Sequence, residues 1–119
     1  MASKFDGYWQ NDGVMNASRL IAITGTGGDH FLVAKIVYRN TLTDALEDDC
    51  TFLCTVEMQG SESVLEQRIV RPREDESALQ ASERAKRVAE KMAWLWARIV
   101  GQRMLREKRA KRFGAMQSV

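Results

Sequence analysis

Residues 64 to 85, VLEQRIVRPREDESALQASERA, contain a change in the hydrophobic period of the chain. Before Pro72 the pattern follows the two-residue period of a strand, and after it the 3.6-residue period of a helix. Ser77 with Gln80 three residues later is a capping-box pattern, and the acidic residues 74–76 suit the positive end of a helix dipole. The stretch therefore predicts that a sheet ends near residue 71 and that a helix begins near residue 76.

Three segments before this point are predicted as strands: 19–24, 30–39 and 50–59. Each of the last two places apolar side chains on one face, because successive residues of a strand point to opposite sides. Those faces carry Leu32, Ala34, Ile36 and Tyr38 in one strand and Cys50, Phe52, Cys54, Val56 and Met58 in the other. Such alternation is typical of an antiparallel sheet with one solvated face.

The segment after Pro72 lacks proline up to residue 112, and Gly101 is its one glycine. Helical angles predict a broad apolar face made of Ala81, Ala85, Val88, Ala89, Met92, Leu95, Trp96, Ile99 and Val100. The predicted fold class is α+β, a four-stranded antiparallel β-meander followed by one long C-terminal α-helix. The chain is predicted to be a single domain, with an N-terminal arm or short strand at 1–17, the sheet at 18–71, the helix at 76–112 and a tail at 113–119.

The composition is that of an ordinary globular protein, with 119 residues, 45% of them hydrophobic and 29% charged. Neither a spanning apolar run nor a secretory signal is present, so a cytoplasmic, reducing setting without membrane contact is expected. Cys50 and Cys54 lie four residues apart in a predicted strand, roughly 13 Å and too far for a disulfide. Both thiols are predicted to fill the core.

The net charge of +2 conceals two unlike halves. Residues 1 to 75 carry 7 Lys or Arg against 12 Asp or Glu, a net charge of −5. Residues 76 to 119 carry 11 against 4, a net charge of +7. The split predicts either an anionic partner for the basic half or neutralisation of one half by the other within or between subunits.

The basic end of the predicted helix is the strongest functional signal. A helix dipole favours one or two cations in the last turn, whereas this end carries Arg98, Arg103, Arg106, Lys108, Arg109, Lys111 and Arg112 against Glu107. The first hypothesis is contact with the phosphates of nucleic acid, RNA-binding or DNA-binding. The alternative is an acidic protein surface, including the acidic half of a second copy.

Trp94 and Trp96 lie in KMAWLWARIV, residues 91 to 100. Residues two apart on a helix point about 200° away from each other, so both indoles cannot enter one core. Trp96 is predicted to be a core residue. Trp94, in a neighbourhood that includes Leu105, either lies across Lys and Arg stems or anchors an interface. Ala97 and Gly101 add a strip of small residues where another backbone can approach.

The outer face of the predicted sheet carries Phe31, Val33, Val37 and Leu53. RNA-recognition sheets present several aromatic rings for stacking, and this face offers only Phe31. An apolar face of this kind usually packs on an arm, another sheet or a subunit. The face is therefore predicted as an interface, and the protein as a homo-oligomer.

Candidate catalytic and metal sites are poorly supported. The glycines of TGTGGDH precede a strand rather than a helix, so they predict a hairpin turn instead of a phosphate loop. His30 has no evident nucleophile beside it, and the acidic run Asp44, Glu47, Asp48 and Asp49 fits a solvated loop better than a calcium loop. No catalytic residue, metal or cofactor is predicted. The favoured function is a non-catalytic, self-associating nucleic-acid-binding protein, and the alternative is an adaptor, inhibitor or coat subunit anchored by Trp94.

Overall fold

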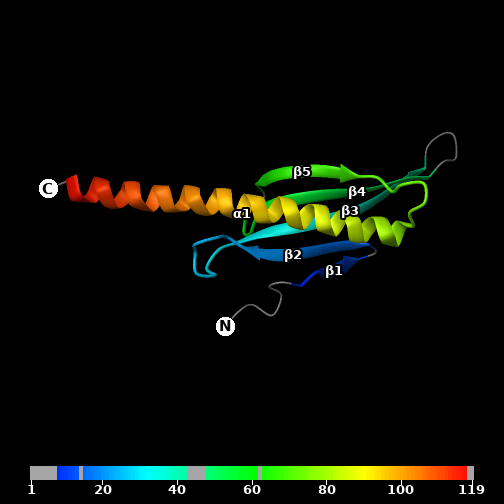
Figure 1. Cartoon of the computed structure of the whole chain (residues 1–119), viewed down its shortest axis with the longest axis horizontal. Coiled ribbons are helices and arrows are strands. Elements are labelled where there is room, and N and C mark those ends of the chain that lie inside the picture. Colours follow the sequence, from blue (N-terminus) through cyan, green and yellow to red (C-terminus); the bar gives the residue numbers. More distant parts are fainter. Residues whose placement is uncertain (1–7, 14, 43–47, 62, 118–119) are drawn as a thin grey trace.

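The computed structural model describes residues 8–13, 15–42, 48–61 and 63–117. Within these ranges a five-stranded antiparallel sheet has one long helix lying across one of its faces (Figure 1). The elements are β1 (Gln10–Gly13), β2 (Asn16–Ala22), β3 (Phe31–Leu42), β4 (Asp48–Met58), β5 (Val64–Val70) and α1 (Ala78–Gln117). Strands that are neighbours in sequence are neighbours in the sheet, which leaves β1 and β5 at its edges. The predicted α+β class is confirmed.

The predicted number of strands, four, is wrong, because residues 10–13 of the predicted arm form β1. Gln10 of β1 lies opposite Ser18 of β2. The four residues of β1 are polar and exposed, so they carry no hydrophobic alternation that could reveal a strand. Other boundaries differ too: β2 begins at Asn16, β3 and β4 extend into the predicted 40–49 connection, and α1 includes most of the predicted tail.

The inner face of the sheet has the predicted residues. Leu32, Ala34 and Ile36 of β3 are at most 1% exposed, and so are Phe52, Cys54 and Val56 of β4. In the register of the two strands Ala34 lies opposite Val56 and Ile36 opposite Cys54. The Tyr38 ring packs against Phe52 with 5.3 Å between centroids. This face forms the core together with α1.

The predicted apolar face of the helix is partly wrong. Leu95 and Ile99 are 56% and 37% exposed, whereas Ala93, Ala97 and Gly101 are buried. The buried stripe takes every fourth residue, and four residues turn a helix about 40° past a full turn. The stripe therefore rotates around α1 as the helix follows a twisted sheet. Its members are Ala81, Ala85, Ala89, Ala93, Ala97 and Gly101.

The start of α1 confirms the predicted capping box. Gln80 N donates to Ser77 Oγ at 3.1 Å, and Ser77 N donates to the Gln80 side chain at 2.9 Å. Arg84 fastens the preceding turn, because its Nε and Nη2 donate to the two carboxylate oxygens of Glu76 at 3.0 and 2.8 Å. The same guanidinium donates to the carbonyl of Arg71 at 2.6 Å. The end of the sheet and the start of the helix are thus joined through one side chain.

The hydrogen bonds between Arg84 and Glu76 make the stability of the fold depend on pH in the acid range. Hydrogen bonds from Arg84, followed by one from the Arg73 backbone, lower the pKa of Glu76 from 4.5 to about 2. Because the folded pKa is depressed, the stabilisation is complete above pH 4.5 and is lost as the pH falls through about 2. We expect Glu76→Gln to flatten the pH dependence of the melting temperature in this window. Thermal melts of both proteins from pH 6 to pH 2 check it, and parallel curves would contradict it.

The β2–β3 turn docks on α1 at Gly101. Thr24 N donates to the carbonyl of Ala97 at 3.3 Å, and a Cβ on Gly101 would lie 2.2 Å from the Thr24 carbonyl oxygen. The predicted close approach of another backbone at Ala97 and Gly101 is therefore made by the chain itself. Gly25, Gly27 and Gly28 of this turn have positive φ angles, as the predicted hairpin turn requires.

Candidate nucleic-acid interface

The last third of α1 extends beyond the sheet. Met104 still packs partly against the core, and the residues from Leu105 to Gly114 are all exposed. Figure 1 shows this part of the helix, in orange and red, continuing past the ends of the strands. Thirteen residues from Leu105 to Gln117 span about 20 Å of helix axis. We call residues 105–117 the projecting helix.

The seven predicted phosphate contacts lie on or just before the projecting helix, and all are exposed: Arg98, Arg103, Arg106, Lys108, Arg109, Lys111 and Arg112. In the described part of the chain no carboxylate makes an ion pair with any of them. Several cations elsewhere are paired: Arg19 with Glu90, Lys35 with Glu57, and Arg84 with Glu76. The structure therefore gathers unneutralised positive charge at one end of the molecule.

The cations surround the helix instead of forming one stripe. At about 100° per residue, Arg103, Lys108 and Arg109 point in three different directions. Like charges also recur at helical neighbour spacings, as in Lys108 with Lys111 and Lys108 with Arg112. Such pairs destabilise a helix by a few tenths of a kcal/mol each. A partner that supplies negative charge on several sides would remove this repulsion.

The two tryptophans lie on opposite sides of α1. The Trp96 indole N–H donates to Glu66 Oε1 of β5 at 2.7 Å, and the ring is half-buried. Trp94 is 49% exposed, and the Arg19 guanidinium of β2 lies 6.0 Å from its ring centroid. Leu105, 48% exposed, is on the same side of the helix and borders a hollow beside Thr24. The cation beneath Trp94 thus comes from the sheet and not from α1.

The outer face of the sheet brings the predicted apolar residues together. Val37 lies opposite Leu53, which lies opposite Ile69, while Val33 pairs with Leu20 and Phe31 with Ala22. Phe31, Val33, Val37 and Leu53 are half-buried by their neighbours in the sheet. No described element covers this face.

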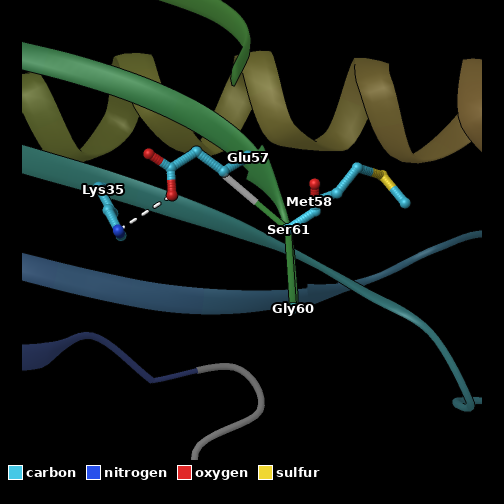
Figure 2. Close-up of a pocket in the computed structure, with 5 residues that line it drawn as sticks. All are labelled: Lys35, Glu57, Met58, Gly60 and Ser61. Atoms are coloured by element: carbon cyan, nitrogen blue, oxygen red, sulfur yellow. Dashed lines mark ion pairs between the residues drawn. The ribbon is translucent and has the colours of Figure 1, made fainter. Parts of the chain in front are cut away.

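Lys35 cannot serve this outer face as a free cation. Figure 2 shows Lys35 and Glu57 pointing toward each other, with 2.9 Å between Nζ and Oε2. The open hollow there has a volume of about 540 Å³ and is also lined by Met58, Gly60 and Ser61. Because the one cation in its lining is neutralised, the hollow is a poor phosphate site.

Side-chain contacts between distant segments were not visible in the sequence. Glu90 of α1 accepts a hydrogen bond from the Trp9 indole and pairs with Arg19 at 3.0 Å. Lys86 lies 6.0 Å from the Trp9 ring centroid. Trp9 precedes Glu90 by 81 residues, so no local pattern could indicate the contact. These residues hold the helix on the β1 and β2 side, as Trp96 and Glu66 hold it on the β5 side.

The side chains that could hold a metal ion are not clustered in the described residues. No group of three or more His, Cys, Asp or Glu there is placed to hold a metal ion. His30 is exposed and Cys54 is buried, which raises the pKa of the Cys54 thiol to about 11. Of the predicted acidic loop, Asp44 and Glu47 lie outside the described residues, whereas Asp48 and Asp49 begin β4. The prediction that all four lie in a loop is therefore wrong for the last two.

Comparison with known proteins gives no independent guide to function. No helix among the described residues is long and apolar enough to cross a membrane. No known protein family, curated protein or solved structure matches the chain.

Proposed function

We propose that the protein is a non-catalytic, self-associating nucleic-acid-binding protein that contacts phosphates through its projecting helix. The observation that carries the proposal is the exposed, unpaired positive charge of this helix, where Glu107 is the one carboxylate among residues 98–114. Phosphate contacts depend on charge more than on base sequence. The expected ligand is thus a DNA or RNA backbone bound with little sequence preference.

The distribution of the cations supports backbone contact over reading of bases. A helix that reads a groove needs its contacts on one face, whereas these cations point to several sides. Arg103, Arg106, Arg109 and Lys111 are proposed as direct contacts. An anionic strand that wraps around the helix, or several strands that surround it, can reach all four.

The test is the salt dependence of binding. Each neutralised phosphate contributes about −0.7 to −0.9 to the slope of log affinity against log salt concentration. We expect replacement of Arg103, Arg106, Arg109 and Lys111 by Gln to flatten this slope by about three units. Fluorescence anisotropy with labelled single-stranded and double-stranded oligonucleotides, at salt concentrations from low to high, measures the slope.

A matched variant distinguishes the effect of where the cations lie from the effect of the total charge. Arg39, Arg73, Arg87 and Lys91 are also exposed but lie away from the projecting helix, and their replacement by Gln changes the net charge equally. This variant should keep the parent's slope. Equal effects of the two variants, or no binding by the parent at low salt, would contradict the proposal.

A protein-interaction module remains the second candidate, because Trp94 and Leu95 are adjacent large apolar residues that are 49% and 56% exposed. Trp and Arg are enriched among residues that dominate binding energies, and Trp94 lies over Arg19. An acidic protein surface could then meet the projecting helix. Binding of a polyanionic protein, with no binding of nucleic acid at low salt, would favour this candidate.

A further inference from the structure

The outer edge of β5 has no partner among the described residues. β5 pairs with β4 on one side and ends the sheet on the other. In an edge strand every second residue points its N–H and C=O groups away from the sheet. Such a row of groups is a template on which another strand can pair.

The two edges of the sheet differ in how well they resist pairing. β1 has four residues, and its register with β2 is irregular between Asn11 and Gly13. β5 has seven residues and contains neither Pro nor Lys, two residues that commonly protect edges. Its one irregularity is the extra residue Leu65, so Glu66 to Val70 pair regularly with β4. β5 is therefore the accessible edge.

The sequence of β5 is complementary to itself in the antiparallel direction. When Gln67 is placed opposite its own copy, Glu66 lies opposite Arg68 in both halves of the pair. Opposite charges at these positions stabilise neighbouring strands, whereas like charges destabilise them. Within one chain Arg68 Nη2 already lies 3.2 Å from Glu66 Oε2, so pairing would place four alternating charges together.

The helix leaves room for a second copy at this edge. α1 packs mainly over β3 and β4. It therefore lies about two strand spacings from the two-fold axis that would relate two copies paired at the edge of β5. With strands about 4.8 Å apart, two such helices would be roughly 19 Å apart, more than the 8–10 Å of direct helix contact. The space between the two helices is wide enough to be filled by side chains. Trp96 donates a hydrogen bond to Glu66 of β5, and Ile99, one helical turn later, is 37% exposed.

We propose that β5 is the docking surface for a second copy of this chain, which pairs antiparallel about Gln67 to form one continuous sheet. The proposal deepens the self-association in the proposed function and is independent of nucleic-acid binding. Its charge pairs are Glu66 of each copy with Arg68 of the other.

Charge reversal at the centre of β5 tests the pairing. Arg68→Glu places carboxylates opposite one another in both halves of the dimer, and Glu66→Arg places guanidinium groups there. Each variant should raise the dimer dissociation constant by about tenfold or more. Sedimentation equilibrium from one to one hundred micromolar measures it, with circular dichroism to confirm that each variant is folded.

Mixing the two variants distinguishes the interface from contacts within a chain. The Arg68→Glu chain carries carboxylates at both positions, and the Glu66→Arg chain carries guanidinium groups at both. When the two chains pair about Gln67, opposite charges therefore face each other at every position. The equimolar mixture should dimerise more tightly than either variant does alone. The internal Glu66–Arg68 pair stays broken in both chains, so recovery cannot come from it.

A cross-link tests the register without changing any charge. Gln67→Cys should form a disulfide-linked dimer on mild oxidation, because a residue opposite its own copy has a Cα separation within disulfide range. Gln10→Cys is the matched control, since Gln10 is an exposed glutamine on the opposite edge. It retains the same native thiols and should stay monomeric on a non-reducing gel.

The failures of the two proposals can be told apart. A parent that is monomeric at one hundred micromolar overturns the β5 interface whatever its affinity for nucleic acid. A parent dimer that Arg68→Glu leaves intact and that Gln67→Cys does not cross-link also overturns it, and places self-association on another surface. Loss of nucleic-acid binding alone leaves the β5 interface standing.

Discussion

Trp96→Ala is expected to lower the free energy of unfolding by about 3 kcal/mol, the lower end of the range for truncated aromatic side chains in cores. The indole is half-buried between α1 and β5, and its N–H donates to Glu66 at 2.7 Å. Truncation removes both the packing and the hydrogen bond, while Glu66 keeps Arg68 as a partner. Urea denaturation followed by circular dichroism measures the change.

Trp94→Ala is the matched control, because it removes the same side chain two residues away. Trp94 is 49% exposed and contacts the Arg19 guanidinium at 6.0 Å, so a loss below about 1 kcal/mol is expected. If Trp94 anchors a contact, its truncation should weaken association by about 2 kcal/mol or more. Equal losses of stability for the two variants, with association unchanged, would refute the different roles assigned to the two indoles.

Gly101→Ala is expected to lower the free energy of unfolding by about 2 kcal/mol or to separate the β2–β3 turn from α1. The added Cβ would lie 2.2 Å from the Thr24 carbonyl oxygen, which belongs to the backbone and cannot rotate away. Overpacking of this kind costs about 1–3 kcal/mol, and more when the backbone must move. A fall in melting temperature of roughly 8 °C corresponds to this loss.

Gly114→Ala makes the same chemical change in the same helix with the opposite expected sign. No atom lies within 4 Å of a Cβ placed there, and alanine favours a helix over glycine by up to about 1 kcal/mol. The effect at Gly114 should be small and stabilising because the position lies near the helix end. Stabilisation by both substitutions would show that Thr24 does not lie against Gly101.

Much of the fold was predictable because its signals are local. The change of period at Pro72 and the pair Ser77 and Gln80 depend on neighbouring residues, and the capping hydrogen bonds are present. The N-terminal residues were predicted only as an arm or short strand and β1 was not counted in the sheet, because an exposed, polar edge strand has no apolar face. Leu95 was assigned to the buried face because a fixed helical wheel assumes a straight stripe, whereas contact with a twisted sheet shifts the stripe along the helix.

The candidate site was predictable in its residues and less so in its surroundings. The charge run from Arg103 to Arg112 is visible in the sequence. Its separation from the sheet depends on where the strands end, which no helical pattern records. The accessible edge of β5 was hidden for the same reason, because an edge is defined by the order of strands in the sheet.

The projecting helix also determines how the molecule moves in solution. The radius of gyration is 18.2 Å and the extents are 70 × 32 × 21 Å, whereas a compact chain of this length has a radius of gyration of about 13.5 Å. Friction rises with such elongation, so a single copy will elute from a sizing column ahead of compact proteins of equal mass. Its rotational diffusion will be anisotropic, with slow reorientation of the long axis and faster rotation about that axis. A fluorophore on α1 will therefore report rotational diffusion that depends on the orientation of its dipole to the helix axis.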